Sequence, residues 1–322
     1  MRKIINRLTV VTLCLWLTVI SANAARMLMP VGQVVGLALE DNTVTVAAFD
    51  ETIGQAAQQA GLKVGDRILS VNGKTIRTAE DVRYALNRAD RTVELTVLRN
   101  KKSDTLRLTP TVTKDGPKLG IYLKQGVTGV GTITWYDPES KKFGALGHGV
   151  NNARGELLNM VAGSAYEAAV VSVRKGACGA PGQLMGALQE REPVGKLYKN
   201  TSRGVFGTTD TGWTGELLPM ATAEEIKTGK ATIRSTVQGT RVQEYSVEIL
   251  KVYPNSGASG RNILLRITDP ALLDATGGIV QGMSGSPIIQ DGKLIGAVTH
   301  VLVNDPTTGY GIFIENMLDA AA

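Results

Sequence analysis

Glycine divides most of this chain into short segments. The 322 residues include 37 glycines but only 4 phenylalanines. Glycine supplies the backbone angles that tight turns need and weakens the interior of a helix. Between the glycines lie short apolar runs with the length and spacing of strands, such as Val130–Trp135, Thr232–Val237 and Leu294–Val298. The chain is therefore expected to be mainly β, with an antiparallel barrel or sandwich from residue 119 onward.

The first 24 residues have the three parts of a secretory signal peptide. Basic residues come first, an apolar run extends from Leu8 to Ile20, and the small-x-small triplet of a cleavage site occupies residues 22–24. An uncleaved signal-anchor is the alternative, because the run is short for a membrane span but has a basic flank. In either case we expect the rest of the chain to be exported across the cytoplasmic membrane.

Charge and cysteine content argue against several classes of protein. The net charge is only +6 at pH 7, and three of the basic residues lie in the signal-like segment, so nucleic-acid binding is not indicated. Cys14 lies in that segment too, which leaves Cys178 without an intramolecular disulfide partner. The only histidines, His148 and His300, are far apart in sequence and show no zinc-ligand spacing. We expect neither a metal nor another cofactor.

Residues 30–109 are predicted to form one compact α/β module. Ala57–Lys74 resembles the PDZ signature of exported bacterial proteases, in which a helix ends at Gly61 and Asn72-Gly73 makes a tight turn. A helix with an apolar face follows at Ala79–Arg88. The resemblance implies a PDZ domain; an ordinary small β domain without a ligand is the alternative.

A PDZ domain binds an extended peptide between a strand and its second helix, with the peptide carboxylate on backbone N–H groups. We expect Val34–Leu39 to form the carboxylate-binding loop and the strand, with Gly36 allowing close approach of the ligand. The side chains predicted to line the groove are Leu37, Leu39, Val82 and Leu86. These four are equally suited to a hydrophobic core. The expected ligands are a protein substrate or a second copy of the chain.

Residues 110–118 have the composition of a linker, with two prolines, a glycine and three charges. The second domain is therefore expected to span residues 119–322.

The segment Gly282-Met-Ser-Gly-Ser-Pro287 is the strongest catalytic signal. A nucleophilic serine needs a tight turn that exposes its Oγ and leaves nearby N–H groups free for an oxyanion. Here Ser284 is the candidate nucleophile, the N–H groups of Gly282 and Ser284 are the candidate oxyanion hole, and Gly285 lets the chain bend away. A plain Gly/Ser turn is the structural alternative.

His148 is the better of the two candidate bases. It follows an apolar strand and is flanked by glycines, so its ring can project into a cleft, whereas His300 lies in a strand predicted to wall the substrate pocket. Cys178 paired with His148 is a weaker alternative, because a single cysteine is more often a small core residue.

The motifs around these residues resemble the stage IV sporulation protein B peptidase family. The similarity is carried by Gly-Ala-Leu-Gly-His148, Thr268-Asp269 and residues 277–311. It implies a PDZ domain joined to a chymotrypsin-like β-barrel serine peptidase. It also implies export from the forespore into the space between two membranes, and cleavage of a membrane-anchored regulator that leads to late sigma-factor activation. Self-cleavage is implied as well.

The third catalytic residue is expected to be Asp269, to which the family resemblance points. Asp210 is the alternative, because the order His, Asp, Ser favours it by spacing alone. Either carboxylate is also suited to capping a turn. The competing function is a catalytically inactive PDZ scaffold of a membrane complex.

Overall fold

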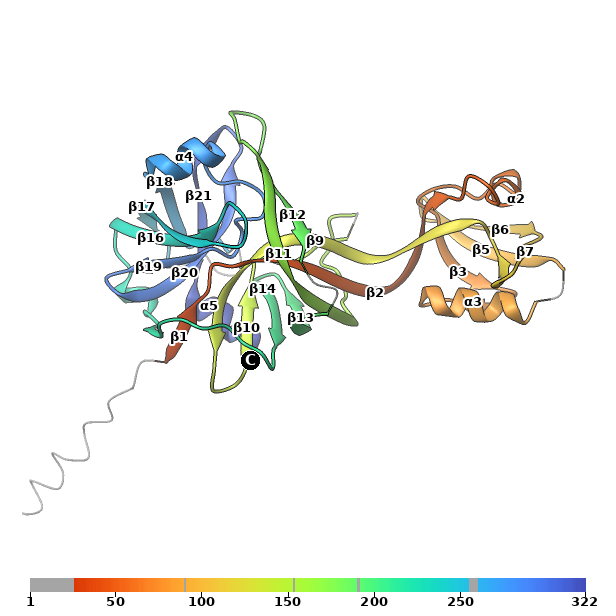
Figure 1. Cartoon of the computed structure of the whole chain (residues 1–322), viewed down its shortest axis with the longest axis horizontal. Coiled ribbons are helices and arrows are strands. Elements are labelled where there is room, and N and C mark those ends of the chain that lie inside the picture. Colours follow the sequence, from red (N-terminus) through yellow and green to blue (C-terminus); the bar gives the residue numbers. More distant parts are fainter. Residues whose placement is uncertain (1–25, 90, 153, 190–191, 255–259) are drawn as a thin grey trace, which may run out of the picture.

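A computed structural model describes residues 26–89, 91–152, 154–189, 192–254 and 260–322. The signal-like segment lies outside these residues. Two β-barrels lie side by side, and a smaller domain is held away from them by a long two-stranded ribbon (Figure 1). The expectation of a mainly β chain is confirmed. Within the described residues, no helix has the length and apolar character needed to cross a bilayer.

The first barrel is a ring of six antiparallel strands. In ring order these are β2 (Val34–Phe49), β9 (Ile121–Asp137), β10 (Lys142–Ala145), β14 (Gly204–Thr208), β13 (Gly195–Thr201) and β11 (Ala162–Arg174), which pairs with β2 again. Short strands extend this sheet, namely β1 (Met27–Pro30) with β15 (Leu218–Pro219) beside β9, and β12 (Gln183–Leu188) beside β11. Alternating side chains from β2 and β9, including Leu37, Leu39 and Ile133, fill the core.

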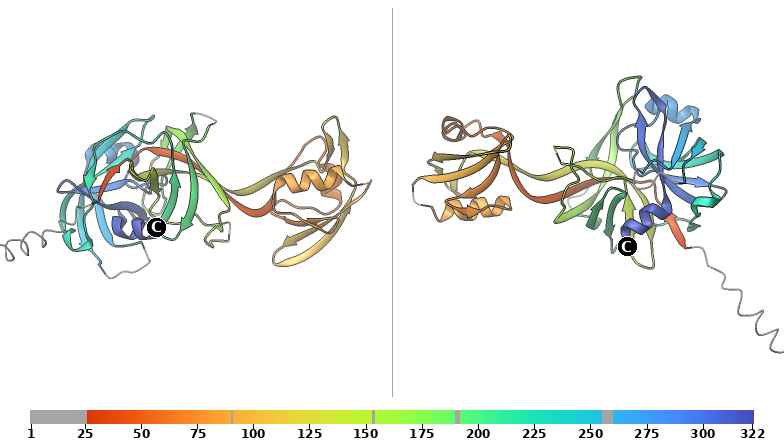
Figure 2. Two further views of the ribbon diagram at one scale, coloured as in Figure 1. Left: turned by 90° about the horizontal axis from the view of Figure 1, so that it is seen from below. Right: turned by 180° about the vertical axis from the view of Figure 1, so that it is seen from behind.

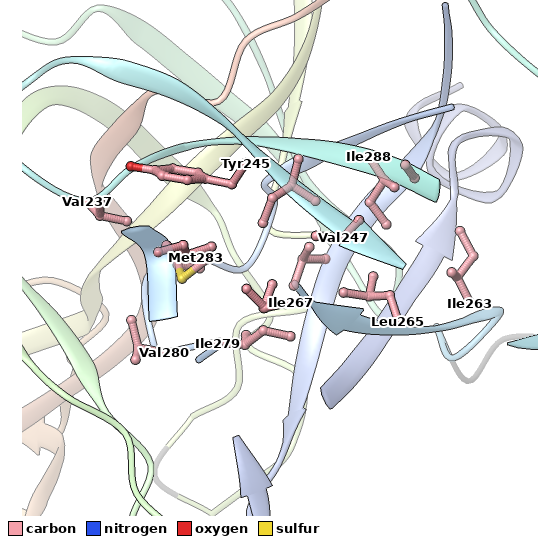
Figure 3. Close-up of a cluster of buried hydrophobic side chains, with 14 of the residues drawn as sticks. Val237, Tyr245, Val247, Ile263, Leu265, Ile267, Ile279, Val280, Met283 and Ile288 are labelled. Atoms are coloured by element: carbon pink, nitrogen blue, oxygen red, sulfur yellow. The ribbon is translucent and has the colours of Figure 1, made fainter. Parts of the chain in front are cut away.

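The second barrel is also closed and is built from consecutive antiparallel strands. It consists of β16 (Gly229–Thr236), β17 (Val242–Val252), β18 (Ile263–Ile267), β21 (Asp305–Phe313), β20 (Lys293–Leu302) and β19 (Pro287–Gln290). Figure 3 shows the apolar side chains that meet inside it, among them Val247, Leu265 and Ile288. Three short helices lie outside the strands: η1 (Ala223–Glu225), α4 (Pro270–Thr276) and α5 (Ile314–Ala321).

The smaller domain is built on the outer halves of β2 and β9. Its other elements are α2 (Gln55–Gln59), β3 (Arg67–Val71), β4 (Lys74–Thr75), α3 (Ala79–Asn87), β5 (Val93–Arg99), β6 (Lys102–Leu108), β7 (Thr111–Thr113) and β8 (Gly116–Lys118). A capping box between Thr78 and Asp81 starts α3, whose buried face packs into a core separate from the barrels. Both views in Figure 2 show this domain at the far end of the ribbon.

The domain boundaries differ from those expected from the sequence. Residues 34–39 pair with both β9 and β11 in the first barrel. The small domain therefore does not begin at residue 30 as expected. Residues 111–118 form the β7–β8 hairpin instead of a linker. The small domain is thus inserted between two strands of the first barrel. The sequence concealed this because strand periodicity does not show which distant strand is the pairing partner.

Candidate active site

The Ser284 loop belongs to the second barrel but is held by the first. Val280 and Met283, which precede Ser284, point into the second barrel's core (Figure 3). Thr132 on β9 donates its N–H to the Ser284 carbonyl at 3.0 Å. Its Oγ1 donates to the Gly282 carbonyl at 2.8 Å. Thr132 therefore fixes the loop from across the barrel interface.

Two backbone N–H groups of this loop are free. Met283 donates to Val280 at 3.1 Å and Gly285 donates to Val298 at 2.8 Å, but within the described residues the N–H groups of Gly282 and Ser284 have no protein acceptor. Gly282 has a φ of +102°, which favours glycine. Free N–H groups on either side of one residue are suited to holding an oxyanion.

Gly285 has a packing reason to lack a side chain. Its φ is +98°, and a Cβ at this position would lie 2.1 Å from the Thr132 carbonyl oxygen. The chain after Ser284 can therefore pass close under β9 only if this residue is glycine.

His148 follows β10 on a turn with left-handed backbone at Leu146 (φ +70°) and Gly147 (φ +69°). Its Nδ1 lies 2.9 Å from the Gly149 carbonyl oxygen. A carbonyl can only accept, so Nδ1 carries the proton and Nε2 is left as an acceptor. Burial lowers the pKa of His148 below its ordinary 6.5, which keeps the ring neutral near pH 7. This is the form that a general base requires.

His148 and Ser284 line the same pocket, which has a volume of about 310 Å³ and lies where the two barrels meet. The Ser284 Oγ donates to the Thr299 carbonyl at 2.9 Å instead of to the histidine. The candidate nucleophile and base therefore share one cleft, and a rotation of the serine side chain is needed to join them.

His300 lies next to His148, with the ring centroids 5.5 Å apart. Its pKa is lowered to about 4, first by burial and then by the charges of His148 and Arg261. Its Nδ1 is buried and has no hydrogen-bond partner. Sequence reasoning placed His300 in a pocket wall but did not foresee its contact with His148, which depends on the packing of one barrel against the other.

Neither candidate aspartate contacts His148. Asp269 is the N-cap of α4, where its Oδ1 accepts from the N–H groups of Ala271 and Leu272 at 3.0 and 3.1 Å. Its Oδ2 accepts from the Ser246 N–H at 3.3 Å. Both oxygens therefore serve local backbone, and the expected contact of Asp269 with the base is not present in this structure.

Asp210, the alternative, has an almost fully exposed side chain that pairs with Lys141 at 3.4 Å. The end of β13 passes close to the His148 turn. A Cβ on Gly149 would lie 2.7 Å from the Thr201 carbonyl oxygen. In the described chain, no carboxylate forms an ion pair or hydrogen bond with His148. The Gly149 carbonyl alone orients the ring.

The residues predicted for the peptide groove are divided between two domains. Gly36, Leu37 and Leu39 lie in the first barrel, where Gly36 packs against Leu188 and the two leucines line the pocket of His148. They do not form a PDZ groove, because the inner half of β2 is a barrel strand. Val82 and Leu86 are on the buried face of α3, within the small domain.

Leu119-Gly120-Ile121 is a better candidate for the carboxylate-binding loop, and sequence reasoning missed it. Leu119 is buried, and Gly120 has a φ of +67° just before β9 begins. Gly116 lies beside Asn87 at the C-terminal end of α3. At the N-terminal end of this helix, the Ala79 N–H donates to the Gln125 side chain at 3.4 Å. The outer end of β9 thus runs along α3, and the described strands pair with only one of its edges there. The sequence signal was an apolar-Gly-apolar triplet directly before a strand.

Comparisons with known proteins agree with two parts of this description. The family model for the SpoIVB peptidase S55 matches residues 115–318, and that for a PDZ domain matches residues 52–99.

A putative zinc metalloprotease of Rhizobium meliloti (strain 1021), R01501, is 35% identical over 98 residues, which are 30% of this chain and 25% of that protein. Another from Mesorhizobium japonicum, mll0638, is 36% identical over 80 residues, 24% of this chain and 22% of that protein. The chain spans about a quarter of the length of these curated relatives. Among the residues described here, no cluster of three or more His, Cys, Asp or Glu side chains is placed to hold a metal ion.

Two solved structures are also similar. The active form of the Rv3671c protease from M. tuberculosis is 15% identical, covering 74% of this chain and 82% of that chain with a TM-score of 0.33. The PDZ domain of the SdrC-like protein from Listeria monocytogenes is 21% identical, covering 26% of this chain and 87% of that chain with a TM-score of 0.22.

Proposed function

Because the chain belongs to the SpoIVB peptidase S55 family, and so to the serine peptidases, we propose that it is an exported endopeptidase in which His148 activates Ser284. The observation that carries the assignment of these two residues is their meeting in one pocket, beside the free N–H groups of Gly282 and Ser284. A neutral imidazole with an unprotonated Nε2 completes the requirement for a base.

In the proposed reaction, the Ser284 side chain first turns from the Thr299 carbonyl toward Nε2 of His148. His148 takes the hydroxyl proton while Oγ bonds to the carbonyl carbon of the scissile peptide. The N–H groups of Gly282 and Ser284 hold the resulting oxyanion. His148 then gives its proton to the leaving amine as the C–N bond breaks. A water molecule, deprotonated by the same ring, hydrolyses the acyl-enzyme.

The Gly149 carbonyl takes the orienting role that a carboxylate has in a Ser-His-Asp triad. It fixes the tautomer, as an aspartate does, but it carries no full charge to stabilise the imidazolium. We therefore propose a dyad assisted by a backbone carbonyl.

The proposed substrate is a membrane-associated regulatory protein of a sporulation pathway, together with the enzyme itself. The family resemblance supports this substrate, and the signal-like residues 1–24 support an exported enzyme, either released or anchored by that segment. The proposed location is the space between the forespore membranes.

The small domain is proposed to position a partner by adding its C-terminal peptide to the free edge of β9. The N–H groups of Leu119 and Gly120 have no acceptor in the described residues and are suited to the peptide carboxylate. The Ser284→Ala chain should bind peptides with a free C-terminus and not the same peptides amidated, measured by fluorescence anisotropy over a peptide library. Equal binding of both forms would refute this role.

The catalytic proposal is tested with a fluorophosphonate probe on the full chain. We expect the wild type to be labelled and Ser284→Ala to be unlabelled. Ser286→Ala is the control, since Ser286 is fully buried and donates to Ser235 at 3.0 Å. It should keep its labelling. An unlabelled wild type would instead support a catalytically inactive PDZ scaffold.

A further inference from the structure

We infer that the pocket beside His148 binds the side chain of the substrate residue that follows the scissile bond, and that it selects a large apolar residue there. The inference rests on the proposed function, because it takes His148 as the base and Ser284 as the nucleophile.

The side of the scissile bond follows from the route of the proton. The base must return its proton to the leaving amine, so the amine and the residue that carries it lie beside His148. The pocket extends from Ser284 over His148, Gly149 and Val150 toward β2. Of the described residues, none from β20 lines it, although the Thr299 carbonyl on that strand accepts the serine hydroxyl bond. The pocket is therefore on the leaving-group side.

The lining of the pocket is almost entirely apolar. Among the described residues, Asn151 and Gln281 are the only polar side chains besides the catalytic pair, and no charged residue lines the pocket. Its apolar side chains are those of Leu37, Leu39, Val127, Leu146 and Val150, whereas Val130 lines it from β9 with a side chain that points toward Gly186 on the other face of the sheet. A charged side chain entering this space would lose its hydration without gaining a partner, whereas an apolar one gains about 25 cal/mol for each Å² buried.

Gly129 keeps the pocket open. It lies on β9 directly opposite Leu37, and a Cβ built on it meets nothing within 4 Å. Its φ is outside the left-handed region, so a larger residue fits there without backbone strain. A leucine at this position would extend into the space that the substrate side chain is proposed to occupy.

Thr128 provides a matched control on the same strand. It is exposed and pairs with Ala38, so its side chain points to the opposite face of the sheet from that of Gly129. Thr128→Leu adds bulk to β9 outside the pocket. Circular dichroism and thermal melting of both variants show whether the barrel is intact.

The test is cleavage-site profiling of a proteome-derived peptide library by mass spectrometry, alongside fluorophosphonate labelling of Ser284. In the wild type we expect large apolar residues to exceed Lys and Glu about tenfold at the position after the cut. In a folded Gly129→Leu enzyme, this preference should move to Gly, Ala and Ser with about a tenfold loss for Leu and Phe. Thr128→Leu should match the wild type.

The inference is overturned if the wild type shows no preference at that position, if Gly129→Leu keeps the wild-type preference, or if both variants change alike. Failure of the proposed function looks different: the wild type would then be neither labelled at Ser284 nor active on the library. A Gly129→Leu chain that does not fold also counts against the inference, because the open space at Gly129 is one of its premises; Gly129→Ala then tests the size dependence.

Discussion

The two barrels differ in how they are built and in what they bring to the active site. The second barrel is continuous in sequence from residue 229 to residue 313 and has its own core, and it supplies Ser284. The first barrel extends from residue 34 to residue 208, and an entire domain is inserted between its first two strands. It supplies His148. The difference indicates that the proposed nucleophile sits on a self-contained body, whereas the proposed base sits on a body that is continuous with the small domain.

Strand β9 contributes hydrogen bonds to the joint between the two barrels. β9 begins in the small domain, and its residue Thr132 reaches the carbonyls of both Gly282 and Ser284. One strand therefore links the small domain to the Ser284 loop.

The largest expected effect is the loss of either member of the catalytic pair. Ser284→Ala and His148→Ala should each lower kcat/KM by at least about 10⁴-fold, and the double variant should be no worse, because the two groups act as a unit. Cleavage of a peptide selected from the library profile measures this. If the double variant were much less active than either single one, the barrels would be contributing independently.

A smaller effect is expected when the joint is weakened. Thr132→Val removes the hydroxyl donor to Gly282 but keeps the backbone N–H bond to Ser284. We expect about 1 kcal/mol of lost stability and about a tenfold lower kcat, because Gly282, whose N–H is an oxyanion donor, loses the hydrogen bond that holds its carbonyl. Enzyme kinetics measure the change in kcat, and urea unfolding measures the change in stability.

Thr134→Val is the matched control for that change. Thr134 is on the same strand and fully buried, but its Oγ1 has no hydrogen-bond partner. The variant should keep full activity and be as stable as the wild type or more so. Equal losses in Thr132→Val and Thr134→Val would mean that the joint has no special role.

Replacing Asp269 distinguishes the role seen in the structure, the N-cap of α4, from the catalytic role that the family resemblance implies. Since its side chain caps α4, Asp269→Ala should cost about 1 kcal/mol of stability, whereas Asp269→Asn keeps the cap. The Asp269→Asn enzyme should therefore keep kcat/KM within about threefold of the wild-type value. An Asp269→Asn enzyme that is folded but as inactive as His148→Ala would show that the carboxylate belongs to the catalytic machinery.

The parts that could be predicted from the sequence are those encoded by neighbouring residues. The PDZ signature around Gly61 and Asn72, the strand pattern, and the glycine-rich turns at His148 and Ser284 are all local, and each lies on the element expected of it. A turn needs its glycines next to each other in the chain, so it leaves a readable pattern.

What could not be predicted depends on pairing across long stretches of sequence. Leu37 lies opposite Gly129 because β2 and β9 enclose an inserted domain, and no periodicity in either strand records this. The sequence pattern around Asp269 was equally consistent with an N-cap and with a catalytic acid, and only the position of α4 distinguishes them.

The smallest expected effect concerns the pH dependence of stability. The pKa of His300 is about 4 in the folded chain against an ordinary 6.5, so the unfolded state binds the proton first as the pH falls. The stability that neutral His300 contributes is present above pH 6.5 and is lost as the pH drops toward 4. His300→Gln should therefore show a smaller fall in urea midpoint between pH 7 and pH 4.5 than the wild type, an interval that covers most of this window.

The two buried aspartates that pair with arginines contribute little within that interval. Asp66 and Asp137 have a pKa below the ordinary 3.8, each held down by an arginine and by other hydrogen bonds, so their contribution is lost only at lower pH. If the urea midpoint of His300→Gln falls as much as that of the wild type, the His300 ring is solvated in solution.

The most direct test of the catalytic pair is the pH dependence of the rate at which fluorophosphonate labels Ser284. The acid limb of that rate should lie below pH 6.5, because burial lowers the pKa of His148, and labelling should become negligible in His148→Ala. Peptide mapping should place the label on Ser284. Labelling that persists in His148→Ala, or that maps to another residue, would contradict the assignment of His148 and Ser284 as base and nucleophile.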